Sequence, residues 1–287
     1  MFESPEQALS ALSSVGYFTD QKTATTVYLA GRINKPVMLE GPAGAGKTEL
    51  AQSVARAAGA DLIRLQCYQG INEEKAIGHF DKNLQELFVL LKTKSEETCD
   101  WAQIRQEITS RAFFLAGPLL TVIEREKRCV LLIDEIDKVD HAFEAVLLEL
   151  LSAWAISIPK MGTVKATTVP FVFMTSNQER RLGDPLRRRS FYLIVEHPTA
   201  EREAAIVKSK TPTATAATHR FIAGLAKALR SFNLEKPPSI SEMNDVAKAM
   251  QLLSMEEILA VHKDIMLPLI VKTEGDRKHR RKEPKND

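Results

Sequence analysis

The sequence predicts an α/β fold in which helices cover both faces of a five-stranded parallel sheet, followed by a small all-α domain. Three observations predict this fold. Four short runs are largely apolar, as strands buried on both faces are, and a fifth alternates apolar and polar residues, as other strands do. Segments with apolar residues at helical spacing separate these runs, which favours parallel pairing. After Pro198 the strand patterns stop and only helical patterns follow.

The first two expected elements are helices. Ser4 has the chemistry of an N-cap and Pro5 suits the first helical position, so a helix begins there. A second helix is expected over residues 22–33, and the first strand over residues 37–40. Residues 49–60 form the next helix, because apolar residues recur there at helical spacing.

The segment between this strand and this helix carries a binding motif. Residues 41–48 have the spacing G-x-x-x-x-G-K-[ST] of a phosphate-binding loop. Its glycines let backbone N–H groups surround phosphate oxygens at a helix N-terminus, where the helix dipole favours an anion. Lys47 is expected to reach the β- and γ-phosphates of ATP, and the Thr48 hydroxyl to bind Mg²⁺. The expected nucleotide-binding residues are Gly41, Pro42, Ala43, Gly44, Ala45, Gly46, Lys47, Thr48 and Glu49. The alternative is a glycine-rich turn that binds nothing.

A second motif lies at the end of the apolar run at residues 129–134. The run ends in Asp134 and is followed by Glu135. Ligands of open α/β sheets bind beyond the carboxyl ends of the strands, so both acids are expected in the site. Asp134 is expected to hold Mg²⁺ beside Thr48, and Glu135 to polarise the water that attacks the γ-phosphate. Two solvated acids at a strand end are the alternative.

The remaining elements of the α/β part follow the same alternation. Residues 61–67 alternate apolar and polar side chains, as in a strand, and a helix opens at Gly117 and Pro118. Helices are also expected over residues 72–80, 84–93, within 95–110 and over 143–154. A hairpin is expected over residues 156–169, and the last two strands over 171–175 and 191–195.

The last third of the chain is expected to be helical. The helical patterns cover residues 201–208, 219–231, 241–252 and 255–271. We therefore predict a nucleotide-binding α/β domain over residues 1–198 and a helical lid domain over 199–272. Residues 273–287 carry charges but no apolar anchor, so a disordered tail is predicted there.

Composition and charge restrict the class of protein. With 44% hydrophobic and 26% charged residues, the chain has the balance of a soluble globular protein. It shows no membrane-span-length apolar run and no signal-peptide pattern, which favours a cytoplasmic location. Cys67 and Cys129 are expected to be reduced core residues, and the six scattered histidines predict no protein metal cluster. The net charge is +2, and residues 272–287 alone carry +3, so the nearly neutral remainder makes nucleic acid an unfavoured partner. That basic tail is either a solvated segment or a contact for a partner or for nucleic acid.

These motifs resemble those of the AAA+ ATPases. The resemblance rests on the loop at residues 41–48, the Asp134–Glu135 pair, the Thr175–Asn177 strand end and the Asp184–Arg189 segment, and it extends over nearly the whole chain. Residues 65–71, Gly117-Pro118-Leu119 and the hairpin are similar to the MoxR branch. Within that branch the chain resembles ATPases encoded with aerobic, molybdenum-containing carbon monoxide dehydrogenase.

The resemblance implies site residues and an assembly. Asn177 matches the sensor-1 residue, which helps to orient the attacking water, although an Asx turn after a strand is the alternative. Arg189 matches the arginine finger that acts on a neighbouring subunit's nucleotide, with Arg188 as runner-up and a solvated arginine cluster as the alternative. The implied assembly is a ring, usually a hexamer. Catalytic roles thus fall to Lys47, Glu135, Asn177 and Arg189. Ser241 occupies the position where relatives present a sensor-2 arginine.

The resemblance also implies a function. A MoxR-type ATPase acts as a remodelling chaperone that couples ATP hydrolysis to client maturation or metallocofactor assembly. The implied partners are a von Willebrand A domain protein and a client metalloenzyme, such as a molybdenum hydroxylase of the carbon monoxide dehydrogenase type. The insertion at residues 81–111 and the hairpin tip at Lys160 and Met161 are client contacts in this interpretation, or ordinary surface in the alternative. A nucleic-acid motor or loader and a small-molecule kinase are competing functions for the same loop.

Overall fold

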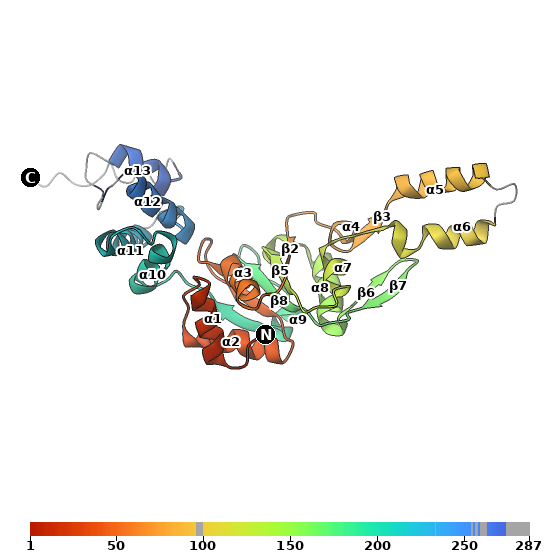
Figure 1. Cartoon of the computed structure of the whole chain (residues 1–287), viewed down its shortest axis with the longest axis horizontal. Coiled ribbons are helices and arrows are strands. Elements are labelled where there is room, and N and C mark those ends of the chain that lie inside the picture. Colours follow the sequence, from red (N-terminus) through yellow and green to blue (C-terminus); the bar gives the residue numbers. More distant parts are fainter. Residues whose placement is uncertain (96–99, 233, 254, 256–257, 259–262, 274–287) are drawn as a thin grey trace, which may run out of the picture.

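The computed structural model describes residues 1–95, 100–232, 234–253, 255, 258 and 263–273. Its main sheet has five parallel strands in the order β2-β5-β8-β1-β9. The strands are β1 (Val37–Glu40), β2 (Leu62–Gln66), β5 (Val130–Asp134), β8 (Phe171–Ser176) and β9 (Phe191–Ile194). All five lie where these runs predict them, so the predicted sheet is confirmed (Figure 1).

Alternation along each strand divides the core into two layers. Leu39 of β1 and Phe173 of β8 belong to one buried cluster, whereas Met38 and Met174 belong to the other. The first cluster includes side chains of α1 (Pro5–Ser14), α2 (Gln21–Arg32) and α3 (Lys47–Ala57). The second includes side chains of α7 (Pro118–Ile123) and α8 (His141–Ala153). Since successive strand residues point to opposite faces, a strand covered on both faces must be apolar throughout.

Local chemistry sets the start of the N-terminal helix. The Ser4 side chain accepts a hydrogen bond from the backbone N–H of Gln7 at 3.1 Å, and Pro5 occupies the first helical position. The cap satisfies one of the N–H groups that a helix N-terminus leaves free, and proline has no N–H to lose there. The predicted helix start is therefore confirmed.

The prediction of a helix over residues 72–80 is wrong beyond its first turn. The helix α4 is short (Glu73–Ala76), and β3 (Gly78–Phe80) then pairs antiparallel with β4 (Phe114–Ala116). Gly78 has a φ of 132°, which no helix contains, and the Phe80 and Phe114 rings meet edge to face at 5.0 Å. The strand forms because its partner approaches from more than thirty residues further along the chain.

This two-stranded ribbon connects the sheet to a projecting pair of helices. α5 (Lys82–Ser95) and α6 (Trp101–Ile108) extend from the end of the molecule opposite the C-terminal helices (Figure 1). We call them the helical arm. The predicted helices within 84–93 and 95–110 correspond to these two elements. The predicted hairpin is also present, as β6 (Ala155–Ile158) and β7 (Gly162–Lys165).

The described part of the C-terminal region contains four helices and no strand: α10 (Ala200–Lys210), α11 (Ala216–Ser231), α12 (Ile240–Leu252) and α13 (Lys263–Ile270). They share a separate apolar cluster. The division of the chain into two domains near residue 199 stays a prediction. Most of residues 255–262 and all of 274–287 lie outside the described residues, so the predicted tail stays a prediction. Across the residues that are described, no helix combines the length and apolarity that crossing a membrane would need.

Candidate active site

Most of the predicted site residues meet at the carboxyl ends of β1, β5 and β8. Lys47, at the start of α3, donates from Nζ to the carbonyl oxygens of Gly41 and Pro42, both at 2.8 Å. It also donates to Asn177 Oδ1 at 2.8 Å. Burial lowers the pKa of Lys47, while Asp137, Asp134 and Glu135 act in the opposite direction. The lysine and Asn177, predicted separately, therefore lie in direct contact.

Asp134 is fully engaged by its neighbours. Its Oδ1 accepts from the Thr48 hydroxyl at 3.0 Å and from the Thr175 hydroxyl. Its Oδ2 forms an ion pair with Arg64, which reaches across from β2. Arg64 is absent from the sequence-based candidates because it belongs to none of the motifs that predict the site. The contact of Thr48 with Asp134 brings together the two oxygen donors predicted to bind a metal.

Glu135 leaves the sheet in an unusual backbone conformation. Its φ of 58° lies in the left-handed region, which costs a residue other than glycine about 1–2 kcal/mol. The Thr175 hydroxyl accepts from the Glu135 backbone N–H at 2.9 Å and helps to hold this turn. The Glu135 carboxylate accepts from Gln66 Nε2 and forms an ion pair with Lys138, each at 3.1 Å. A strained turn maintained beside a ligand cavity is typical of a functional site.

Asp137 is a further acid that the sequence did not single out. Its side chain is buried, and Oδ2 accepts from the backbone N–H groups of Asn177 at 2.9 Å and Glu179 at 3.0 Å. It therefore fixes the turn that presents Asn177. The Asn177 side-chain oxygen is bonded to Lys47, which does not match the alternative of a purely local Asx turn.

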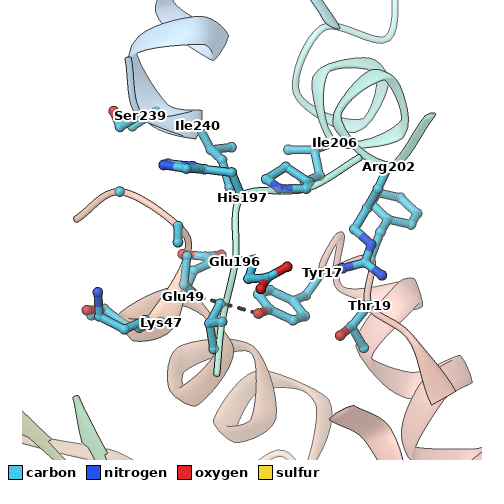
Figure 2. Close-up of a pocket in the computed structure, with 18 of the residues that line it drawn as sticks. Tyr17, Thr19, Lys47, Glu49, Glu196, His197, Arg202, Ile206, Ser239 and Ile240 are labelled. Atoms are coloured by element: carbon cyan, nitrogen blue, oxygen red, sulfur yellow. Dashed lines mark hydrogen bonds between the residues drawn. The ribbon is translucent and has the colours of Figure 1, made fainter. Parts of the chain in front are cut away.

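A cavity of about 970 Å³ lies above these strand ends. Its walls include the loop from Ala43 to Glu49, the segment between β9 and α10, and the start of α12 (Figure 2). Tyr17 lies on the side of α2, where burial raises the pKa of its hydroxyl. Ligand sites typically measure about 300–1,000 Å³, so a nucleotide can be accommodated here.

The loop touches the C-terminal helices directly. The backbone N–H of Ile240 donates to the Gly44 carbonyl oxygen at 3.3 Å. A Cβ atom added at Gly44 would lie 2.3 Å from Ser239 Cβ. The start of α12 is thus packed against the loop, and only glycine fits at this position.

We expect Gly44→Ala to weaken ATP binding by about tenfold, because α12 must move away from the cavity and the loop must absorb the strain. Gly59→Ala is the matched control: Gly59 also has a positive φ, but a Cβ there meets nothing within 4 Å. Titration with a fluorescent ATP analogue measures both affinities. Equal affinities for the two variants would contradict the packing argument.

Two of the predicted groups lie outside the cavity. The carbonyls of Gly41 and Pro42 face Lys47 but these residues do not line the cavity, and neither does Arg189. Arg189 and Arg188 are exposed at the end of α9 (Asp184–Arg189). Arg187 of the same helix forms an ion pair with Glu40 at 3.4 Å. A single chain therefore brings together every predicted catalytic residue except Arg189.

The fold and the loop define a P-loop nucleotide-binding protein. The family model described as "ATPase family associated with various cellular activities (AAA)" matches residues 37–198, more than half of the chain. The chain belongs to this AAA family and is an ATP hydrolase.

Solved structures of Thermotoga maritima RuvB show a looser likeness. One of them, a point mutant of RuvB, is 18% identical, with a TM-score of 0.46, and the match covers 93% of this chain and 70% of that one. The RuvB Holliday junction branch migration motor is 18% identical, with a TM-score of 0.44, and the match covers 90% of this chain and 67% of that one. At these TM-scores neither likeness supports a conclusion about function. No curated protein matches the chain significantly.

Proposed function

We propose that this AAA ATPase is a remodelling chaperone of the MoxR type, which couples ATP hydrolysis to maturation or metallocofactor assembly of a client enzyme. The observation that carries the proposal is the helical arm. It projects beyond the sheet at the end far from the C-terminal helices (Figure 1). An ATPase that acts on another protein needs such a surface outside the nucleotide site, and this arm bears exposed apolar side chains.

The apolar surface lies along α5. Four leucines at helical spacing are between 42% and 59% exposed: Leu84, Leu87, Leu90 and Leu91. Other side chains of α5 make its contacts within the arm: Gln85 Nε2 donates to the Ile108 carbonyl oxygen of α6 at 2.6 Å, and the Phe88 ring meets Phe113, beyond α6, at 5.1 Å. Grouped exposed leucines on one helix mark a surface for another protein, since an amphipathic helix normally buries its apolar face. We call these four residues the leucine stripe.

The arm is connected to the nucleotide site through β2 and β5. The chain enters the arm after β2, where Gln66 contacts Glu135, and it leaves through β4 and α7 into β5, which ends at Asp134. Immediately beyond β2, the Cys67 backbone N–H donates to the Asp134 carbonyl oxygen at 2.8 Å. A shift at either strand end during hydrolysis would therefore reach the base of the arm through the segments that join β2 to β3 and β4 to β5.

In the proposed mechanism the loop N–H groups and Lys47 bind the phosphates, Glu135 accepts the proton of the attacking water, and Asn177 orients that water. The residues fit Mg²⁺, because Thr48 and Asp134 offer adjacent oxygen donors and Mg²⁺ prefers oxygen. Bound there, Mg²⁺ would neutralise phosphate charge. When ATP binds, Lys47 Nζ must exchange its contacts with the loop carbonyl oxygens for contacts with phosphate oxygens. The observed contacts already hold it beside the loop that binds the phosphates.

The partners in this proposal follow from the family resemblance. They are further copies of the chain in a ring, usually a hexamer, a von Willebrand A domain protein, and a client such as a molybdenum carbon monoxide dehydrogenase. The proposed location is the cytoplasm. Arg189 would act on the nucleotide of the neighbouring subunit.

The test is affinity capture from the native host with Glu135→Gln, a variant expected to hold ATP without cleaving it. The bound proteins are identified by mass spectrometry, with Lys47→Ala and nuclease-treated samples in parallel. Recovery of a von Willebrand A protein and a metalloenzyme subunit, lost with Lys47→Ala, is the expected result. Recovery of nuclease-sensitive DNA- or RNA-processing proteins instead would overturn the chaperone proposal in favour of a nucleic-acid motor.

A second capture tests the arm. Serine replaces Leu87, Leu90 and Leu91 together, and Leu252→Ser is the matched control because Leu252 is 86% exposed on α12, away from the stripe. The client is expected to be lost only from the triple variant, with ATP binding retained by both. Undiminished client recovery with the triple variant would exclude the leucine stripe as the contact.

A further inference from the structure

His197 is a polar residue in the cavity that has no role in the proposed mechanism. It lies in the short segment that joins β9 to α10 and is part of the cavity wall. In Figure 2 it lies beside Ile240 and Ile206 of the C-terminal region, above Glu196, and Lys47 lies at the lower left of the same cavity. It therefore stands where the sheet and the C-terminal helices face each other across the cavity.

One nitrogen of the His197 ring has no hydrogen-bond partner in the described part of the chain. Within the described residues its Nδ1 is buried and makes no hydrogen bond, and the same holds for Oδ1 of Asn244, a cavity residue on α12. A buried polar atom without a partner destabilises the protein, because its hydration is lost and nothing replaces it. Most native structures satisfy such atoms with protein, water or ligand. Two such atoms in the wall of one ligand cavity indicate that the ligand supplies their partners.

The charges around His197 keep its ring neutral in the free protein. Burial, then the positive charges of Arg230 and Lys47, lower the pKa of His197 to about 4. Arg230 on α11 is itself paired with Glu203 of α10. On α12 the cavity residues Asp245 and Lys248 pair with each other at 3.4 Å, and Glu196 precedes the histidine in the chain. A neutral ring near two cations is poised to respond to an incoming anion.

We propose that His197 takes up a proton from solvent when ATP binds and then contacts the phosphate chain as a cation. The inference rests on the proposed nucleotide site. The phosphates bring several negative charges close to Lys47, which reverses the local electrostatic potential. A protonated Nδ1 donates a hydrogen bond, so a phosphate oxygen can be the partner that this atom lacks. Because His197 lies between β9 and α10, this contact would tie the phosphate to the segment that joins the sheet to the C-terminal helices.

The proposal fixes the sign of the pH dependence. The pKa of His197 is about 4 in the free protein and must be higher in the complex. Binding is then tighter at low pH: affinity falls as pH rises from about 4 through the higher pKa of the complex, by at most tenfold per pH unit. Above the pKa of the complex the dependence on His197 ends.

Isothermal titration calorimetry with a non-hydrolysable ATP analogue tests the proposal. Titrations at pH 6.5 in two buffers with different ionisation enthalpies give the number of protons taken up. In His197→Gln the glutamine amide can still form hydrogen bonds, as the imidazole can, but it cannot take up a proton. His79→Gln is the matched control, because His79 is exposed on β3. The terminal phosphate also titrates, but this contribution is common to all proteins compared and cancels in the difference.

We expect the wild type and His79→Gln to take up close to one proton more than His197→Gln, and His197→Gln to bind about tenfold more weakly at pH 6.5. If all three proteins bind the analogue and take up the same number of protons, the proposed role of His197 is wrong, while the nucleotide site stands. Lys47→Ala is the one variant expected not to bind the analogue. If the wild type does not bind it either, both the nucleotide site and this inference are wrong.

A measurement on the wild type avoids any dependence on a folded variant. Heteronuclear NMR of the protein with ¹⁵N-labelled histidine reports the ring charge directly. At pH 6.5 one ring is expected to change from neutral to charged when the analogue is added. If no ring changes charge, the proposal is wrong.

Discussion

Glu135→Gln is expected to lower the rate of ATP hydrolysis by about 10²–10³-fold while ATP affinity changes by less than about threefold. Glutamine keeps the size of the side chain and its capacity to contact Gln66, which donates to the carboxylate at 3.1 Å in the structure. It removes the basic oxygen that accepts a proton from water. The loss should therefore appear in kcat and not in binding.

Steady-state phosphate release and analogue titration measure the two quantities. Glu149→Gln is the control, because Glu149 is exposed on α8, away from the cavity. A rate reduced less than tenfold would show that another group activates the water. Weakened binding with unchanged kcat would instead assign Glu135 a structural role, through its ion pair with Lys138 at 3.1 Å.

The motifs that consist of consecutive residues could be predicted from the sequence. The loop at residues 41–48 and the Asp134–Glu135 pair each follow a strand whose apolar run identifies it. Parallel pairing then forces the carboxyl ends of these strands to one edge of the sheet. The contact of Thr48 with Asp134 at 3.0 Å therefore follows from the parallel sheet that the sequence predicts.

The supporting residues of the site were not predictable in this way. Arg64 and Gln66 reach the acids from β2 because β2 and β5 are paired in register, with Gln66 opposite Asp134. Asp137 acts through a backbone turn that lies forty residues further along the chain. Each of these contacts depends on which strands are neighbours, and strand order is not encoded in any local pattern.

The prediction of a helix where β3 lies was wrong for a related reason. A three-residue strand is too short to establish alternation, and the preceding Glu73–Ala76 segment has good helical composition. The pairing of residues 78–80 with residues 114–116 and the contact between the Phe80 and Phe114 rings determine the strand. Propensity is a weak signal where long-range packing decides the conformation.

Arg189→Ala is expected to lower hydrolysis by about 10³-fold or more without weakening ATP binding in the same chain. Arg189 is exposed at the end of α9 and does not line the cavity of its own chain. Arg187 is a poor candidate for the same role, since it pairs with Glu40 and lies 5.0 Å from the Tyr192 ring centroid. Arg188→Ala, also exposed, is the control and should retain most of the activity.

Mixing two inactive variants decides whether Arg189 acts on a neighbouring subunit. Arg189→Ala retains an intact Glu135, and Glu135→Gln retains an intact Arg189. In a mixed ring, an Arg189→Ala subunit next to a Glu135→Gln subunit would have a complete site at their interface, because each chain supplies what the other lacks. Hydrolysis measured in the mixture should therefore exceed that of either variant alone. If Arg189 acted within its own chain, no arrangement of the two variants would complete a site, and the mixture would stay inactive.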